Sequence, residues 1–174
     1  MPDTSLTTAI KEAYALATDD GVIQHTLEFR HPAFTQPIRV VLDHANLIAT
    51  LEADAPVDGG TPVEFVAYAF DMVLPPVDET AKPEIVIAID NVSREITDQL
   101  DAAAEGTAPI ELTYRPYLST DSTQPQMDPP LHLIVMDIDA DNGRINARGT
   151  YGDFANKRFP VEDYTSKRFP GLVR

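Results

Sequence analysis

Apolar and polar side chains alternate along two stretches of this chain, and this two-residue period constrains the fold more than any other feature. In residues 23–30, one face collects Ile23, His25, Leu27 and Phe29, and the other collects Gln24, Thr26, Glu28 and Arg30. Residues 110–117 repeat the pattern, with Ile110, Leu112 and Tyr114 expected inward and Glu111, Thr113 and Arg115 expected outward. Because successive side chains of a strand point to opposite faces, both stretches predict half-buried β-strands.

A β-hairpin is predicted where two further strand-like segments flank an Asn-Gly pair. Residues 131–138 and 144–150 are separated by a short turn that contains Asn142 and Gly143. Asn-Gly favours the type I′ turn, whose backbone twist matches that of two paired strands.

Four more segments predict strands. Residues 38–43 and 47–53 surround a short His44-Ala45-Asn46 turn, and we expect them to pair as a second hairpin. Residues 63–74 and 84–89 are apolar on both faces. Such runs are typical of central strands that are covered on two sides.

Two helices complete the predicted fold. Residues 5–18 have apolar side chains at helical spacing, and so do residues 91–105, whose apolar stripe consists of Val92, Ile96, Leu100 and Ala103. Gly106 is expected at the left-handed position after the second helix. The chain is therefore predicted to be mainly β (α+β), with a single β-rich domain over residues 1–150 that includes an N-terminal helix.

Residues 119–130 are polar and contain three of the prolines. They offer few apolar side chains for packing, so we expect an exposed loop that becomes ordered only against a partner.

The C-terminal segment 151–174 differs from the rest in charge and in pattern. The whole chain has a formal net charge of −15, yet this segment holds five basic residues against three acidic ones. It has no periodicity, and Lys-Arg-Phe-Pro occurs in it twice, at 157–160 and at 167–170. We predict an extended arm that docks on acidic protein, either its own body or a neighbouring copy. The expected anchors are Phe154, Lys157, Arg158, Phe159, Tyr164, Lys167, Arg168 and Phe169.

Composition excludes several functional classes. The chain has no cysteine, which removes disulfides, thiolate nucleophiles and cysteine-ligated metals. No run of 18 apolar residues is present, and the N-terminus lacks a signal-peptide pattern, so we expect synthesis in the cytoplasm and no membrane partner. The acidic body offers no basic stripe for nucleic-acid phosphates.

No residue is predicted to be catalytic, cofactor-binding or metal-binding. Asp137, Asp139 and Asp141 resemble part of a calcium loop, but Asn142 and Arg148 occupy the positions where an EF-hand needs glycine and glutamate. Asp137 and Asp139 are instead expected on the solvent side of a strand. His25 is expected to be a hydrogen-bonded core histidine. A nucleophile elbow and a phosphate-binding glycine loop are both absent from the sequence.

Three segments carry a resemblance to a known family. They are Ile-Ala-Ile-Asp-Asn-Val-Ser-Arg-Glu-Ile (87–96), Ile-Glu-Leu-Thr-Tyr-Arg-Pro-Tyr (110–117) and the ending that runs from Asp153 to Leu172. Together they resemble a family of phage minor tail proteins that was first filed as a domain of unknown function. The resemblance spans residues 60–174, and Tyr-Thr-x-x-x-Phe-Pro-Gly-Leu is its most specific part.

The resemblance implies a non-enzymatic structural component of the tail tip of a long-tailed phage or prophage. Such proteins are similar in architecture to distal-tail and tail-tube proteins, with a β-sandwich or split β-barrel and a flanking helix. They form rings, commonly hexameric, between the tail tube protein and the tail hub protein. DNA would then pass the lumen without specific binding, and the protein would reside in the virion after assembly in the host cytoplasm. The alternative is a calcium- or carbohydrate-binding β module of a receptor-binding tail part.

Overall fold

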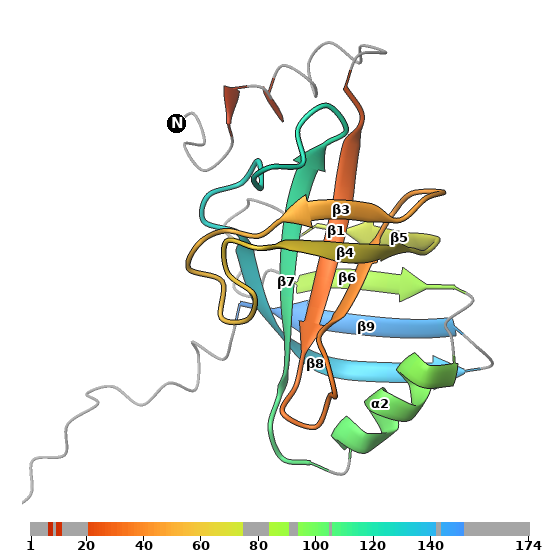
Figure 1. Cartoon of the computed structure of the whole chain (residues 1–174). Coiled ribbons are helices and arrows are strands. Elements are labelled where there is room, and N and C mark those ends of the chain that lie inside the picture. The colour runs from red at the N-terminus through yellow and green to blue at the C-terminus, as the bar shows by residue number, and fades with distance from the viewer. Residues whose placement is uncertain are drawn as a thin grey trace, which may run out of the picture.

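The computed structural model describes residues 7–8, 10–11, 21–74, 84–90, 94–104, 106–141 and 144–151 (Figure 1). This part of the chain is mainly β, as the sequence predicts. Its elements are β1 (Ile23–Arg30), β2 (Ile38–Val41), β3 (Leu47–Thr50), β4 (Pro62–Ala67), β5 (Phe70–Val73), β6 (Glu84–Ile89), α2 (Arg94–Ala104), β7 (Ile110–Leu118), β8 (Leu131–Asp141) and β9 (Arg144–Thr150).

All nine of these strands belong to one open mixed sheet, in the order β3-β4-β2-β1-β7-β8-β9-β6-β5. Every pairing is antiparallel except that of β2 with β4, where Val40 lies opposite Val66. In Figure 1, β1 and β7 run crosswise to β6, β8 and β9. Strands of one sheet can change direction in this way because the twist accumulates from strand to strand.

Strands from both halves of the sheet contribute to one hydrophobic core. Leu27 of β1 lies opposite Tyr114 of β7 and opposite Val40 of β2, and these side chains are buried. They pack with the inward residues of β5, β6, β8 and β9. The core comprises Leu27, Phe29, Ile38, Val40, Phe70, Ile85, Ile87, Ile89, Leu112, Tyr114, Leu133, Val135 and Ala147. The alternation of residues 23–30 and 110–117 therefore predicted the apolar face correctly.

Helix α2 flanks this core, which confirms the second predicted helix. Leu100 and Ala103 are buried, and Ile96 packs against the core cluster, whereas Val92 lies outside the described residues.

The prediction for Gly106 is wrong, because this glycine does not adopt a left-handed backbone. A Cβ there would lie 3.3 Å from Cε1 of His31, so the glycine allows a close approach of that ring.

The predicted hairpin of residues 38–53 is wrong. Strands β2 and β3 do not pair with each other, because β4 lies between them, antiparallel to β3 and parallel to β2. Asn46 fixes this arrangement: its Oδ1 accepts a hydrogen bond from the N–H of Ala67, and its Nδ2 donates to Glu64. The His44-Ala45-Asn46 turn, which suggested a hairpin, instead connects β2 to β3 across the position that β4 occupies between them.

The predicted continuous strand of residues 63–74 is also divided. It forms β4 and β5, which lie toward opposite ends of the sheet. Neither β4 nor β6 is covered on both faces: in β4 Phe65 is buried and Glu64 exposed, and in β6 Ile87 is buried and Val86 exposed. Strands β1 and β7 are buried on both faces, and so is β2, where the neighbouring Val40 and Val41 belong to different cores.

The hairpin of β8 and β9 is confirmed, with Asp141 opposite Arg144. Its register shifts between Val135 and Asp137, which leaves Met136 unpaired and 64% exposed. Residues 142–143 lie outside the described residues, so the type I′ turn stays a prediction.

Residues 119–130 are ordered against the protein's own body, which corrects the prediction of a loop that needs a partner. The N–H of Gln126 donates to the carbonyl of Pro116 (2.8 Å), and that of Thr50 donates to Ser122 (2.9 Å). The Gln126 residue is only 3% exposed. Backbone hydrogen bonds to neighbouring strands compensate here for the scarcity of apolar side chains.

Of the predicted N-terminal helix, only four residues are described. Thr8, Ile10 and Lys11 are helical, and Ile10 is fully buried. The N–H of Thr7 donates to the carbonyl of Gln126, which joins this segment to the loop before β8. No helix in the described part of the chain is long and apolar enough to cross a membrane. The predicted arm beyond Tyr151 lies outside the described residues.

Candidate functional site: a buried ion-pair network beside a surface groove

The polar face of β1 carries a fully buried carboxylate. The Glu28 side chain has no exposed area, and three arginines surround it. Arg39 of β2 donates to Glu28 Oε2 at 2.9 Å, while Arg115 of β7 and Arg30 of β1 approach its oxygens at 3.6 and 3.5 Å. The strand register brings these charges together, because Arg39 lies directly opposite Glu28 and Arg115 lies diagonally on β7, two residues after the Thr113 that pairs with Glu28. The buried negative charge is therefore compensated from both neighbouring strands.

Arg115 extends the network to the chain that follows β3. Its fully buried guanidinium makes a two-pronged contact with Glu52, with Nε and Nη2 each 2.6 Å from a carboxylate oxygen. Burial alone would raise the pKa of Glu52, but the bonds from Arg115 outweigh it and hold that pKa below its ordinary value. Glu52 therefore remains a carboxylate, and the pair attaches residues 51–61 to β7.

A second contact attaches the same segment, because Arg39 Nη2 also donates to Asp58 at 2.8 Å. Asp58 has a left-handed backbone, with φ at 56°, as does Gly60 at 69°. A Cβ on Gly59 would lie 2.7 Å from the carbonyl oxygen of Ala53, so only glycine fits there. The tight turn of residues 52–60 thus places two carboxylates above the arginines of the sheet.

Strands β3 and β4 cover the rest of this face. Figure 1 shows them lying across β1 and β7. Tyr117 of β7 packs beneath them, and its hydroxyl donates to the carbonyl of Thr50 at 2.9 Å. Burial raises the pKa of Tyr117 far above its ordinary value. The resulting second core comprises Val41, Ala49, Leu51, Val63, Phe65 and Tyr117.

The sequence prediction for this face is therefore wrong. Thr26, Glu28, Thr113 and Arg115 are buried, although the alternation placed them toward solvent. Alternation identifies two faces but does not reveal that a second layer covers the polar one. One signal was available: β1 and β7 each carry opposite charges on one face, Glu28 and Arg30 in β1 and Glu111 and Arg115 in β7, as expected of strands whose charged side chains pair.

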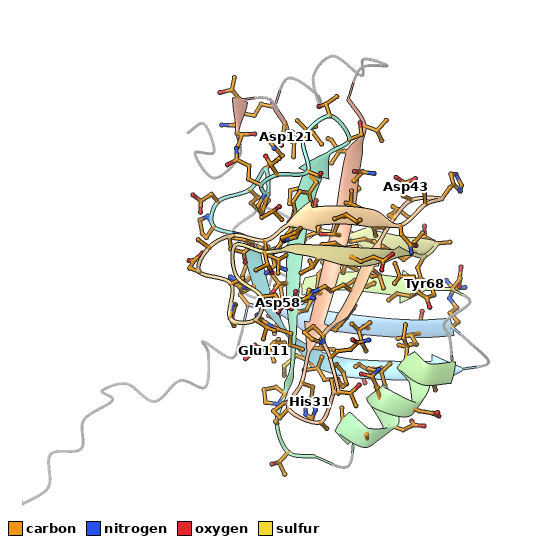
Figure 2. The ribbon with its side chains drawn as sticks, in the orientation of Figure 1. His31, Asp43, Asp58, Tyr68, Glu111 and Asp121 are labelled. Carbon is orange, nitrogen blue, oxygen red and sulfur yellow. The ribbon has the colours of Figure 1, made fainter. Side chains whose placement is uncertain are left out.

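A surface groove runs beside the network. Its central hollow has a volume of about 380 Å³, and four prolines and Phe34 contribute to its lining: Pro32, Phe34, Pro37, Pro56 and Pro109. A hollow of about 340 Å³ adjoins it through Arg30, Pro56 and Glu111, and includes Tyr151. Another of about 520 Å³ adjoins it through Gln36 and Pro37, and includes Asp58. In Figure 2, Asp58, Glu111 and His31 follow one another toward the lower end of the molecule.

Three of the four histidines have structural partners for their rings. His25 Nδ1 lies 2.8 Å from the hydroxyl of Tyr114, which confirms the predicted hydrogen bond, and burial lowers the pKa of His25. His31 uses both ring nitrogens, since Nδ1 accepts from the N–H of Ala33 and Nε2 lies 3.1 Å from the carbonyl of Ala108. His132 lies 3.1 Å from the hydroxyl of Thr113. These contacts orient side chains within the sheet and the loop after β1.

Metal binding finds no support among the described residues, where no group of three histidines or carboxylates lies close enough to hold an ion. Asp137 and Asp139 are exposed on β8, opposite Arg148 and Asn146 of β9. Their predicted position on the solvent side of a strand is confirmed.

The residues predicted as assembly contacts all follow Tyr151 and lie outside the described residues. They are Phe154, Lys157, Arg158, Phe159, Tyr164, Lys167, Arg168 and Phe169. Their role stays a prediction. Tyr151, the last described residue, lines the 340 Å³ hollow of the groove.

The chain belongs to the family described as Domain of unknown function (DUF1833), whose model matches residues 9–164. This match includes the β-rich body and the first Lys-Arg-Phe-Pro. No curated protein matches the sequence.

Proposed function

We propose that this member of the DUF1833 family is a structural component of the tail tip of a long-tailed phage or prophage. It would form a ring between the tail tube protein and the tail hub protein. The observation that carries the proposal is the resemblance of residues 87–96, 110–117 and 153–172 to phage minor tail proteins. The family match over residues 9–164 supports it, since it includes the first two of these segments and part of the third.

The architecture agrees with that assignment. Phage tail tubes and distal rings are built from β-rich subunits, and this chain has one mixed sheet with α2 at its flank. Both halves of the sheet enclose one core, and β3 and β4 form a second layer over β1 and β7. We interpret this arrangement as a β-sandwich or split β-barrel of the tail-tube type.

The charged cluster supports a structural role rather than a catalytic one. Glu28, Glu52 and Arg115 are committed to one another, and their contacts attach the segment after β3 to β7. Such a network favours one arrangement of the covering layer over alternatives. We therefore propose a scaffold without enzymatic activity, which resides in the virion tail.

The ring would be held by contacts between unlike surfaces of neighbouring copies. Closed rings form when one patch of a subunit binds a different patch of the next. The basic, aromatic arm after Tyr151 and the acidic body supply two such patches, and we assign the eight predicted arm residues to this contact. The excess negative charge of the body suits a lumen through which DNA passes without specific binding.

Deleting residues 152–174 tests this proposal. Because every residue of the two described cores precedes Tyr151, we expect a soluble, folded body with an unchanged circular dichroism spectrum that no longer assembles with the tail tube and hub proteins. The measurement is the yield and length of tail structures by electron microscopy when all tail proteins are produced together. Normal tails from the truncated protein would contradict the proposal. A truncated protein that is folded poorly or precipitates would indicate that the arm covers its own body.

A further inference from the structure

We propose that the proline-lined groove receives the second Lys-Arg-Phe-Pro repeat, residues 167–170, of a neighbouring copy of this chain. This inference rests on the proposed ring and names the two surfaces that would join its subunits. The observations that carry it are the lining of the groove, the charges along its edge and the length of chain that follows Tyr151.

The lining suits an aromatic side chain followed by proline. Pro56 and Val57 form part of one wall, and Phe34 and Pro109 contribute further apolar surface. Val57 is 40% exposed, so it presents an apolar group that the fold itself does not bury. Rigid proline and aromatic surfaces bind proline-containing segments well, because neither side loses much conformational freedom. The central hollow, about 380 Å³, has room for a Phe-Pro pair.

The edge of the groove carries carboxylates that can receive the Lys-Arg pair. The side chains of Glu111 and Asp58 are 58% and 47% exposed. Each already accepts one arginine of the body, through Oε2 of Glu111 and Oδ2 of Asp58. A carboxylate accepts several hydrogen bonds, so the second oxygen of each can take a further donor. Basic groups before Phe169 would thus meet acidic groups beside the apolar hollow.

The length of the arm favours a second copy as the source of this segment. Phe169 follows Tyr151 by 18 residues, a span of roughly 60 Å when extended. A compact chain of 174 residues has a radius of gyration of only about 16 Å. The second repeat can therefore reach beyond its own body, whereas Phe159, eight residues after Tyr151, can extend only about 26 Å.

Cysteine cross-linking tests this contact, because the chain has no cysteine of its own. One variant carries Val57→Cys in the groove and a second carries Gly171→Cys directly after the repeat, so that Lys167 to Pro170 stay intact, both in otherwise full-length protein. Mixed under mild oxidation, they should form a disulfide-linked dimer. The matched control is Val22→Cys, an exposed valine (63%) at the opposite end of β1 from Arg30. Binding raises the effective concentration of the two thiols, so the Val57 pair should react roughly a hundredfold faster than the Val22 pair.

Two further measurements make the result specific. Glu111→Gln keeps the shape of the edge but removes its charge, so it should slow the cross-link severalfold, as should added salt. A single chain with both Val57→Cys and Gly171→Cys should give disulfide-linked dimers and larger species. An internal disulfide in a monomer would overturn the assignment to a second copy, and equal rates for Val57 and Val22 would overturn the groove itself.

The particle mass of the unmodified protein separates this inference from the proposed function. If full-length protein forms a closed ring alone or with the tail tube protein, but the cross-link is absent, only the groove assignment fails. If no ring forms under either condition and tails assemble normally without the protein, the proposed function fails as well.

Discussion

The two faces of the β1–β7 pair are both buried, but by different interactions. One face, with Leu27, Phe29 and Leu112, lies in an apolar core where burial itself is favourable. The other, with Glu28 and Arg115, is buried only because its charges meet partners. Removing a charged group from water is unfavourable unless a paired charge compensates it. The apolar face should therefore tolerate substitutions that change its shape a little, whereas the charged face should tolerate almost no loss of a partner.

The largest expected effect comes from removing one charge of the network. Arg115→Met keeps the length of the side chain but removes the positive charge that contacts both Glu28 and Glu52. We therefore expect a loss of about 3–5 kcal/mol in the free energy of unfolding. Urea denaturation measures this loss. The control is Arg144→Met, because its contact with Asp90 is exposed on both sides and should contribute less than about 1 kcal/mol. Equal effects of the two substitutions would show that burial adds nothing to the Arg115 contacts.

A slightly smaller effect is expected on the apolar face. Leu27→Ala removes a fully buried side chain and should lower the free energy of unfolding by about 2–5 kcal/mol, by creating a cavity. Because no charge is involved, this loss should be the same in low and high salt. Combining Leu27→Ala with Arg115→Met tests whether the faces are independent. Additive losses would support separate layers, and strong coupling would mean that the sheet transmits strain between them.

The difference between the faces also explains which parts of the fold the sequence could predict. The apolar face followed from the spacing of Leu27, Phe29 and Leu112, because a two-residue period has one interpretation once a strand is assumed. The β8–β9 hairpin followed from Asn142-Gly143 in the same way. Both inferences depend on neighbours in the sequence.

The covered polar face did not follow, because its cause lies far along the chain. Arg115 is buried by Glu52, 63 residues away, and by a β4 strand inserted between β2 and β3. Parallel pairing of β2 with β4 leaves no local signature, and the His44-Ala45-Asn46 turn suited a hairpin equally well. The groove escaped prediction for the same reason, since its prolines come from three separate loops.

Acid should weaken the charged face before it affects apolar packing directly. The Glu52 pKa lies below its ordinary value of 4.5 in the folded protein, so the unfolded chain binds its proton first as the pH falls. The contribution of Glu52 to stability is therefore present above pH 4.5 and is lost as the pH falls through the lower, folded-state pKa. Glu52→Gln should be less stable at pH 7 but should lose less of its stability on acidification. Parallel stability curves for the two proteins from pH 6 downward would contradict this assignment.

His25 provides the smallest and most specific comparison, because it is a titrating group on the apolar face. Burial lowers its pKa from 6.5, so the unfolded chain takes up the proton first, and stability should begin to fall as the pH drops below about 6.5. This window lies above that of Glu52, so the two faces can be separated by pH alone. His25→Gln can keep a hydrogen bond to the hydroxyl of Tyr114 and removes the titration. The measurement is the slope of unfolding free energy between pH 7 and pH 5, which should be shallower in His25→Gln and unchanged in Glu52→Gln. If His25→Gln shows the same slope as the unsubstituted protein, the imidazole of His25 is solvated well enough to be protonated without disturbing the apolar face.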